Sequence, residues 1–380
     1  MNIHPFTTPP DERYCTRCVM GSRDPDIVFD SDGICNYCKA LLVRLEKETY
    51  YKSGSEKLNQ LVSNIKKAGE GKEYDCVIGL SGGVDSSYVA YLVKKHGLRP
   101  LAIHLDNGWN SELAVQNIQE ILSRLNIDLY THVIDWNEFK DLQLSFIRAN
   151  VPNIEIATDH AINAILQQMA CKFGVRHIIT GGNIKGEGIY PKSWGWYNLD
   201  LRHIKAIHKK FGNVKLATYP TLSLLQFLFN TIFRKIRTVP ILNYVEYNKI
   251  EAKKLLESEL GWRPYGGKHF ESIWTRFYQG YIMTRKFGVD KRQAHYSSLV
   301  VAGDMNREDA LSDLQVDPYG DNDLEADFDY VIKKFEITES EFSNIMLSPP
   351  VAHTDYSNDG WFLDGMPKLK AIAKRIATKV

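Results

Sequence analysis

The stretch Cys76-Val77-Ile78-Gly79-Leu80-Ser81-Gly82-Gly83-Val84-Asp85-Ser86-Ser87 decides the fold. An apolar run ends in Ser-Gly-Gly, where glycines allow unusual φ values and close approach of the backbone to a ligand. A helical pattern follows at once, and backbone N–H groups at a helix start bind anions such as phosphate. A Walker A loop would need a lysine after its glycines. Asp85 instead fits a phosphate group that arrives with Mg²⁺, since this cation prefers carboxylate and phosphate oxygens.

Short apolar segments alternate with helical patterns around this stretch. Strands are expected at residues 75–80, 100–105, 129–134 and 177–180, and helices at 41–68 (interrupted at 50–55), 86–95, 111–125 and 159–173. Ser111 is the expected cap of one helix, and Thr158 or Asp159 the cap of the last. Such alternation predicts an α/β fold, with a parallel sheet buried on both faces and flanked by helices. Residues 184–245 look irregular and aromatic, and 249–380 mostly helical.

Composition limits the classes of function. The chain has 380 residues, 44% of them hydrophobic, with 47 basic and 46 acidic side chains, so its bulk charge gives no support to nucleic-acid binding. No apolar stretch is long enough to predict a transmembrane helix, and the first residues do not resemble a signal peptide. The six cysteines, four of them clustered, suit a reducing cytoplasm better than a disulfide framework. We therefore expect a cytoplasmic protein.

The clustered cysteines form the pattern C-x2-C-x16-C-x2-C, made by Cys15, Cys18, Cys35 and Cys38. Four thiolates complete a tetrahedral site with no position left for water, so the pattern predicts a structural zinc ion. The alternatives are unliganded cysteines or an iron–sulfur cluster. Cys76 and Cys171 lie inside apolar patterns and are interpreted as core residues rather than nucleophiles. We expect a zinc knuckle at residues 1–40, a loop-bearing α/β domain at 41–245 and a helical substrate or partner region at 246–380.

The run Ser81–Ser87 resembles the pyrophosphate loop (PP-loop) of the N-type ATP pyrophosphatases, which include GMP synthetase, NAD synthetase, asparagine synthetase and tRNA thiolases. These enzymes adenylate a carbonyl oxygen and displace AMP with nitrogen or sulfur. The resemblance implies ATP and Mg²⁺ as cofactors, and catalytic roles for Ser81 and Asp85. It also implies nucleotide contacts where open α/β sheets bind ligands, at the carboxyl ends of strands. The implied ATP-binding residues are Ser81, Gly82, Gly83, Val84, Asp85, Ser86, Ser87, Asp106, Asn107, Gly181, Gly182 and Asn183. Taken alone, Asp106-Asn107-Gly108 would be an ordinary turn.

A second resemblance covers nearly the whole chain. The segment from Lys268-His269-Phe270-Glu271 to Arg292-Gln293-Ala294-His295, together with the knuckle, the loop and Thr180-Gly181-Gly182-Asn183, is similar to the N-acetyl sugar amidotransferases. The resemblance implies an enzyme that turns the acetamido group of a UDP-linked sugar into an acetamidino group, for lipopolysaccharide O-antigen or a related surface glycan. It also implies a separate glutaminase subunit, similar to that of imidazole glycerol phosphate synthase, because this chain shows no glutaminase signature.

Basic residues in this segment are interleaved with aromatic ones. Arginine and lysine there could bind a diphosphate and a uronate carboxylate, or could form a solvated helical face. The predicted substrate-binding residues are Lys268, His269, Arg276, Arg285, Lys291 and Arg292, with Lys286 in the same series. Gly186-Glu187-Gly188 and Trp194–Asn198 could line the sugar pocket, or simply pack an irregular connection.

Two other functions and one surface remain open from the sequence. The main rival is a tRNA-modifying sulfurtransferase of the PP-loop group, for which Cys171 alone would have to serve near the active site. A non-catalytic scaffold would leave the intact loop unexplained. The apolar run 222–233, followed by Arg234, Lys235 and Arg237, is interpreted first as a helix buried in the core. It could instead form an interface with the glutaminase or another copy of the chain, or lie on a membrane surface.

Overall fold

The fold is built around one parallel sheet. The computed structural model describes residues 12–265, 271–319 and 321–365. Five strands lie in the order β3-β2-β1-β4-β5, and each neighbouring pair is parallel. They are β1 (Cys76–Gly79), β2 (Pro100–Asp106), β3 (Asp128–Val133), β4 (His177–Thr180) and β5 (Arg237–Pro240). The predicted α/β class is confirmed, and the four expected strands match to within one residue at each end.

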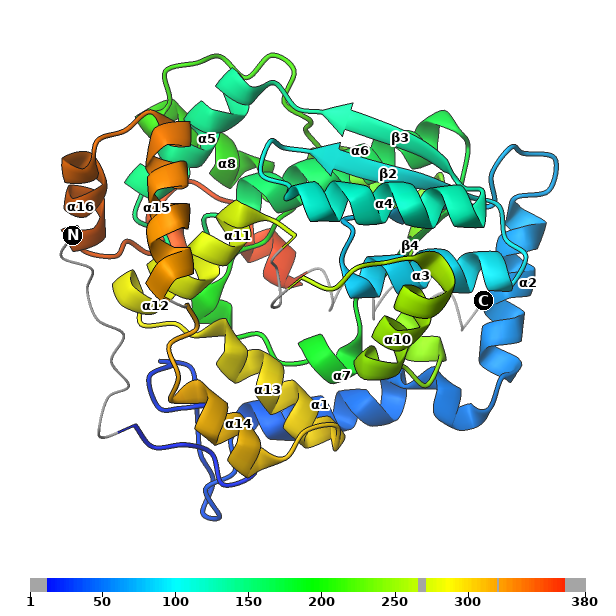
Figure 1. The fold of residues 1–380 in the computed structure, drawn as a ribbon, viewed down its shortest axis with the longest axis horizontal. Helices are drawn as coiled ribbons and strands as arrows, with labels where there is room; N and C mark the ends of the chain where they lie inside the picture. The colour runs from blue at the N-terminus through cyan, green and yellow to red at the C-terminus, as the bar shows by residue number, and fades with distance from the viewer. Residues whose placement is uncertain (1–11, 266–270, 320, 366–380) are drawn as a thin grey trace.

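Helices cover both faces of the sheet because successive strand residues point to opposite sides. Ile78 packs in one core with α3 (Val84–Lys95), α4 (Glu112–Leu125) and α10 (Lys249–Leu260). Val77 packs in another core with α6 (Ile156–Lys172), on the far side of the sheet (Figure 1). The prediction of burial on both faces is wrong for β3, an edge strand whose side chains are largely exposed.

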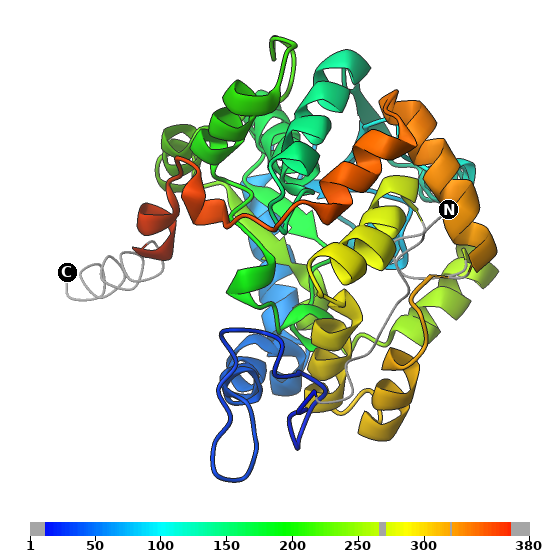
Figure 2. The same cartoon turned by 90° about the vertical axis from the view of Figure 1, so that its left-hand side faces the viewer.

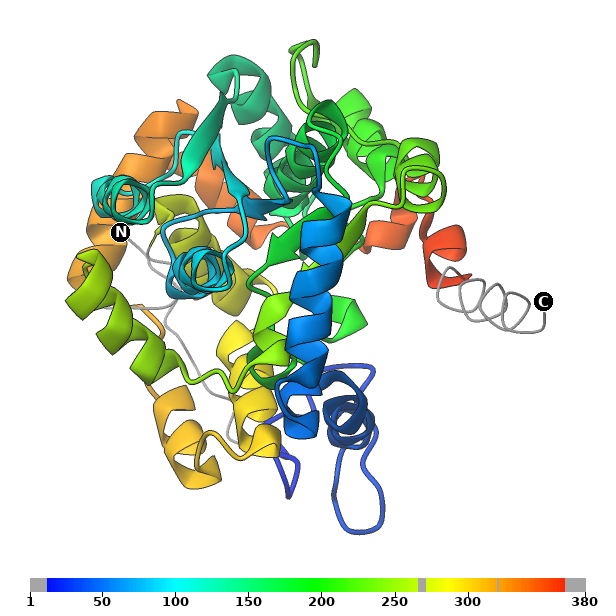
Figure 3. The same ribbon diagram turned by 90° about the vertical axis from the view of Figure 1, so that its right-hand side faces the viewer.

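The N-terminal helices confirm the predicted interruption. They are α1 (Asn36–Glu48), a 3₁₀ turn (Tyr50–Ser53) and α2 (Glu56–Ala68), which appears as the blue helix in Figure 3. The region 184–245 is less irregular than expected. It contains α7 (Ile184–Glu187), α8 (Leu201–Phe211), α9 (Leu224–Ile232), β5 and two 3₁₀ turns (Lys192–Trp194 and Ile241–Tyr244).

Two further details differ from the expectation. Helix α5 (Trp136–Arg148), which packs against α8, was not anticipated. Helix α6 begins at Ile156, and its N-cap residue Glu155 makes no side-chain capping bond. The prediction of Thr158 or Asp159 as cap is therefore wrong. Because a helix that leads into a parallel strand runs antiparallel to it, the start of α6 lies near the carboxyl edge of the sheet, with Asp159 in its first turn.

The C-terminal region is mostly helical, as predicted. It comprises α11 (Ile273–Phe277), a π-helical segment (Tyr278–Ile282), α12 (Met283–Lys286), α13 (Lys291–Ala302), α14 (Arg307–Leu314), α15 (Asp321–Phe335), α16 (Glu339–Leu347) and a 3₁₀ turn (His353–Asp355). The buried aromatic ring of Trp274 packs 5.6 Å from Trp109, which follows β2. Figure 2 shows these yellow-to-orange helices side by side.

The expected domain boundaries remain a prediction. Leu256 of α10 lies in the same core as Ile78, so the helix after residue 245 also covers the sheet. Among the described residues, no helix is both long enough and apolar enough to cross a bilayer.

Candidate active site at the carboxyl edge of the sheet

The phosphate loop, residues 81–87, joins β1 to α3 and has the shape of an anion cradle. Gly82 has a φ of 82°, and its Cα lies so close to Ala114 that an added Cβ would be 2.6 Å from the carbonyl oxygen of Ala114. The N–H of Gly83 donates to the Ser81 hydroxyl at 3.3 Å, and the N–H of Ser81 donates to the Ser86 hydroxyl at 3.3 Å. Helix α3 starts without a side-chain cap. Its first amides are therefore available to a phosphate.

Two aromatic residues hold the loop from the side. The indole N–H of Trp262 donates to the carbonyl oxygen of Gly82 at 2.9 Å, and the Tyr265 hydroxyl donates to the same oxygen at 3.2 Å. Glu271 also approaches, since its carboxylate lies 3.5 Å from where a Cβ of Gly83 would be. These contacts join residues far apart in the chain, so no local sequence pattern indicates them.

Asp85 faces a tyrosine, a lysine and a glycine. The Tyr247 hydroxyl donates to its carboxylate, and the Lys249 ammonium lies 3.7 Å from its other oxygen. Burial and the Asp85 carboxylate hold the pKa of Tyr247 well above its usual value, so this hydroxyl remains a donor. Gly181 packs so closely that an added Cβ would lie 3.0 Å from the carbonyl carbon of Asp85. The loop after β4 thus meets the phosphate loop, as the resemblance implied.

The turn after β2 is ordered by its own side chains. The carboxylate of Asp106 accepts the N–H of Gly108 at 3.0 Å, and the buried Asn107 accepts the N–H of Trp109 at 3.2 Å. His104 donates from Nδ1 to the carbonyl oxygen of Leu80 at 2.9 Å, beside the start of the phosphate loop. Asp106 and Asn107 therefore shape the turn, and their predicted nucleotide contacts remain proposals.

Asn183 caps α7 by accepting the N–H of Gly186 at 2.7 Å. The carbonyl oxygen of Gly186 in turn accepts from Nδ1 of His295 on α13 at 2.7 Å. Gly182 faces Glu187, whose carboxylate lies 3.8 Å from where a Cβ of Gly182 would be. The segment 181–187 therefore links the phosphate loop to α13.

A cluster of charged groups lies at the other end of this link, where α13 meets the start of α6. The Lys291 ammonium lies 3.8 Å from the Glu155 carboxylate, and Gln279 donates to the same carboxylate at 3.0 Å. Lys291 also lies 5.9 Å from the centre of the Tyr190 ring. Desolvation, reinforced by the Glu155 carboxylate, raises the pKa of Asp159 to about 7 even though solvent still reaches its side chain. A carboxylate with this pKa can exchange a proton near neutral pH.

The other predicted substrate-binding cations are already engaged. Arg276 forms a two-point ion pair with Asp327, with both distances 2.6 Å, and the buried Arg285 pairs with Asp317 at 2.6 Å. Arg292 pairs with Asp290 at 2.7 Å. Lys286 donates to the carbonyl oxygens of Ile345 and Ser348, and burial lowers its pKa to about 8. These pairs hold the C-terminal helices together. Lys268 and His269 lie outside the described residues.

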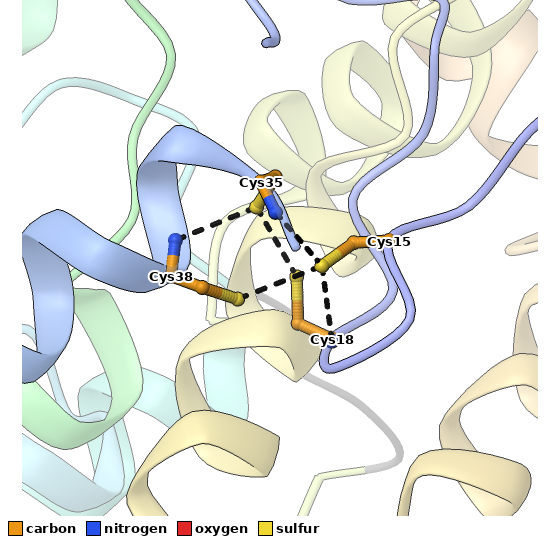
Figure 4. A group of neighbouring side chains, drawn as sticks. All are labelled: Cys15, Cys18, Cys35 and Cys38. Carbon is orange, nitrogen blue, oxygen red and sulfur yellow. Dashed lines mark hydrogen bonds between the residues drawn. The ribbon is translucent and has the colours of Figure 1, made fainter. Parts of the chain in front are cut away.

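The four cysteines converge on one point (Figure 4). The sulfurs of Cys15 and Cys38 are 3.8 Å apart, and those of Cys18 and Cys35 are 3.7 Å apart. A tetrahedral zinc ion with Zn–S distances of about 2.3 Å requires sulfurs about 3.8 Å apart. Backbone N–H groups of Arg17, Cys18 and Cys35 point at the Cys15 sulfur, which suits a thiolate. The site therefore fits the predicted structural zinc.

The knuckle is attached to the C-terminal helices. The N–H of Val19 donates to the Ser297 hydroxyl on α13 at 3.1 Å. Arg307, at the start of α14, donates to the carbonyl oxygens of Cys15 and Cys18 at 2.8 and 3.1 Å. Figure 2 shows the blue N-terminal segment beside the gold helices α13 and α14.

Two protein families match separate parts of the chain. Residues 271–370 match the family described as LPS biosynthesis protein WbpG-like, C-terminal domain, and residues 55–219 match the NAD synthase family. The first match begins at Glu271, beside the phosphate loop, and the second contains that loop.

Curated relatives match shorter stretches. The tRNA(Ile)-lysidine synthase of Chlamydia pneumoniae is 35% identical over 71 residues, which is 18% of this chain and 22% of that protein. The tRNA-specific 2-thiouridylase MnmA of Proteus mirabilis (strain HI4320) is 28% identical over 132 residues, which is 31% of this chain and 36% of that protein. The chain thus spans well under half the length of either relative.

Two solved structures are also similar. NMN synthetase from Francisella tularensis is 20% identical, with a TM-score of 0.30, over 55% of this chain and 86% of that chain. NH3-dependent NAD synthetase from Campylobacter jejuni is 15% identical, with a TM-score of 0.29, over 59% of this chain and 99% of that chain. These scores are too low to support an inference about the present chain.

Proposed function

We propose that this chain, which belongs to the WbpG-like PP-loop amidotransferase family, uses ATP to convert the acetamido group of a nucleotide-linked sugar into an acetamidino group. Its role in glycan biosynthesis follows from the family of its C-terminal part. The UDP-linked sugar and the exact reaction are our proposal. The cytoplasm, where ATP and nucleotide sugars are made, is the proposed location.

One observation carries this proposal: the two matched parts of the chain meet at the phosphate loop. The N–H of Ser111 donates to the carbonyl oxygen of Glu271 at 2.9 Å, and the N–H of Ile273 donates to the carbonyl oxygen of Trp109 at 3.0 Å. These bonds fix the start of the WbpG-like segment against the end of β2, next to the nucleotide side of the sheet. A sugar bound by that segment would be presented to the α-phosphate of ATP.

The proposed reaction has two steps. The acetamido oxygen attacks the α-phosphorus of ATP, and the bond to the β-phosphate breaks as pyrophosphate leaves. Ammonia then attacks the activated carbon, the carbon–oxygen bond breaks, and AMP departs with the former amide oxygen. Amides of Gly83 and the first turn of α3 would hold the pyrophosphate, while the Ser81 hydroxyl orients the loop. Mg²⁺ held through Asp85 would stabilise the charge that develops on the phosphates.

Ammonia must be delivered to the activated carbon. As proposed from the family resemblance, a separate glutaminase subunit supplies it. Asp159, with its pKa of about 7, is our choice for the group that takes a proton from the incoming nitrogen. The nearby Glu155 carboxylate raises this pKa, and the Lys291 ammonium lowers it. Lys291 also remains a candidate sugar contact, since its ion pair with Glu155 is longer, at 3.8 Å, than the pairs of 2.6–2.7 Å that Arg276, Arg285 and Arg292 form.

Isotopes and mass spectrometry test the reaction directly. The purified chain is incubated with ATP, ammonium and a panel of UDP-acetamido sugars whose acetamido oxygen is ¹⁸O. The expected product is about one dalton lighter than its unlabelled parent, because C=O becomes C=NH, and the ¹⁸O should appear in AMP. Label in pyrophosphate or in water, or turnover with tRNA in place of sugars, would contradict the proposal.

The geometry speaks against the tRNA sulfurtransferase alternative. Cys171 lies at the end of α6, near the amino edge of the sheet, and its thiol donates to the Asn230 side chain at 3.4 Å. Cys76 is fully buried within β1. Neither thiol lies at the carboxyl edge, where a sulfur carrier would have to meet the adenylated base.

A further inference from the structure

Helix α9 exposes an apolar face. Leu225, Phe229, Ile232 and Phe233 are 79%, 49%, 61% and 70% exposed, and their spacing of four, three and one places them on one side of the helix. We call these four residues the α9 face. The interpretation of this run as a buried core helix is therefore wrong, although Leu222 before the helix is buried.

The opposite side of α9 is fixed to the body of the protein. Asn230 donates to the Gln167 side chain at 3.2 Å and accepts from the Cys171 thiol at 3.4 Å, both on α6. Ser223 and Gln226 form a capping box at the helix start. Hydrogen bonds to α6 thus fix the orientation of helix α9. Because Asn230 faces α6, the apolar face of α9 points outward.

A basic groove adjoins the α9 face. Its volume is about 640 Å³, and its lining contains no carboxylate but four cations, Lys57, Arg176, Lys235 and Arg237. Within the described part of the chain, none of these four cations forms an ion pair with a carboxylate. Lys235 follows Phe233 by two residues, and the Arg234 guanidinium lies 5.5 Å from the Phe229 ring. Lys235 therefore connects the C-terminal end of the α9 face to the groove.

The position of this surface disfavours the ammonia-supplying subunit as its occupant. The lining of the groove includes His177, the first residue of β4, and Arg237, the first residue of β5. The groove therefore lies at the amino edge of the sheet. The phosphate loop lies at the carboxyl edge. Ammonia released at the groove would have to cross the sheet, where Ile178 and Ile179 are buried and closely packed.

The shape of the surface favours a bilayer over a protein. The apolar part is one helix of nine residues, about 13 Å long at 1.5 Å per residue. A stable protein interface needs about 800 Å² from each partner, which four side chains on one short helix do not supply. A fluid bilayer accepts a short projecting apolar helix, and anionic headgroups match unpaired lysine and arginine.

From the exposed α9 face and the unpaired cations beside it, we propose that this surface binds the anionic lipid headgroups of a membrane, with Leu225, Phe229, Ile232 and Phe233 inserted at the interface. The chain would attach without spanning the bilayer. Its phosphate loop, at the opposite edge of the sheet, would face away from the membrane. The proposal does not depend on the proposed reaction.

Vesicle sedimentation with the full chain tests the proposal. We expect partition onto phosphatidylcholine vesicles that contain phosphatidylglycerol, little partition onto phosphatidylcholine alone, and weaker partition at higher salt. Leu225→Glu combined with Phe229→Glu should abolish partition. Lys235→Gln combined with Arg237→Gln should weaken it roughly 25-fold, at about fivefold for each cation. The matched controls are Val133→Glu, at a 70% exposed position on the far edge of the sheet, and Lys254→Gln on α10, and both should bind as the unmodified chain does.

Three results would overturn the proposal. One is equal partition onto vesicles with and without phosphatidylglycerol, or no partition onto either. Another is a dimer in sedimentation velocity that the Leu225→Glu/Phe229→Glu variant dissociates. The third is selective loss of glutamine-driven turnover in that variant when the glutaminase is present, which would place the partner on this surface. Ammonium-driven turnover is measured in parallel, so failure of the reaction and failure of lipid binding are seen separately.

Discussion

Replacing Gly82 with alanine tests whether the backbone shape of the phosphate loop sets the reaction rate. A residue with a side chain costs about 1–2 kcal/mol in the left-handed region, and Gly82 has a φ of 82°. An alanine Cβ would also lie 2.6 Å from the carbonyl oxygen of Ala114, whereas real Cβ atoms stay at least 3.0 Å from such atoms. The loop or the start of α4 must therefore move by at least 0.4 Å.

This movement displaces the amides that would hold the pyrophosphate. Misplacement of reacting groups by about 1 Å costs about 10²-fold in rate, so we expect kcat for pyrophosphate release to fall roughly 10- to 100-fold. The KM for the sugar should change little, because the proposed sugar contacts lie in the C-terminal helices and not in this loop. Pyrophosphate release is followed with a coupled assay, and the melting temperature is measured on the same samples.

The matched control is Gly54→Ala. Gly54 has a φ of 81°, and no atom lies within 4 Å of where its Cβ would be. It should lose comparable stability while keeping full turnover. If Gly82→Ala turns over as fast as Gly54→Ala, the shape of the loop does not set the rate, and the assignment of residues 81–87 as the pyrophosphate cradle is wrong.

Four further outcomes are expected. Asp85→Ala should abolish AMP formation while the circular dichroism spectrum stays unchanged, since it removes the carboxylate at the reacting phosphates; near-normal turnover would contradict the assignment. Cys35→Ser should reduce the zinc content from about one per chain and lower the melting temperature, and bound iron with visible absorbance would instead favour the iron–sulfur alternative. Burial lowers the pKa of His203 from 6.5 to about 4 and that of His353 to about 3, so the unfolded chain takes up protons first and stability should fall as the pH drops below 6.5. For His203 alone the loss by pH 4 is roughly 3 kcal/mol at about 1.4 kcal/mol per pH unit, measured by urea unfolding, and a flat profile would refute it. At a constant concentration of free NH3, Asp159→Asn should remove the fall in turnover as the pH drops through about 7, yet leave pyrophosphate exchange into ATP intact; unchanged turnover and pH profile would exclude it as the proton acceptor.

Local signals explain what the sequence could predict. The strands, the phosphate loop and the cysteine site depend on neighbouring residues: apolar runs, Ser-Gly-Gly and paired Cys-x-x-Cys spacings. Trp262, Tyr247 and Glu271 could not be found this way, because each meets the loop across 160 to 190 residues of chain. Helix α5 was missed although a local signal marks its start: Asp135 is the N-cap, and Glu138 follows three residues later.

The basic segment shows a different limit of sequence reasoning. A series of cations predicts anion binding, but whether a partner carboxylate already lies nearby is decided only by the fold. Asp327, Asp317 and Asp290 supply those carboxylates for three of the arginines. Helix α9 shows the same limit for apolar residues. Its apolar pattern predicts a core helix, but no other part of the described fold covers its outer face.

The attachment of the cysteine knuckle to α13 has a consequence for how the enzyme depends on metal supply. Ser297 in the middle of α13 and Arg307 at the start of α14 hold the knuckle, and α13 also carries Lys291 at its start and His295 one turn later. Loss of the metal would weaken the contact between the knuckle and α13, the helix that carries Lys291 into the charged cluster with Glu155. Metal-free chain that stays folded would then be slow, and added zinc would restore its rate without new synthesis.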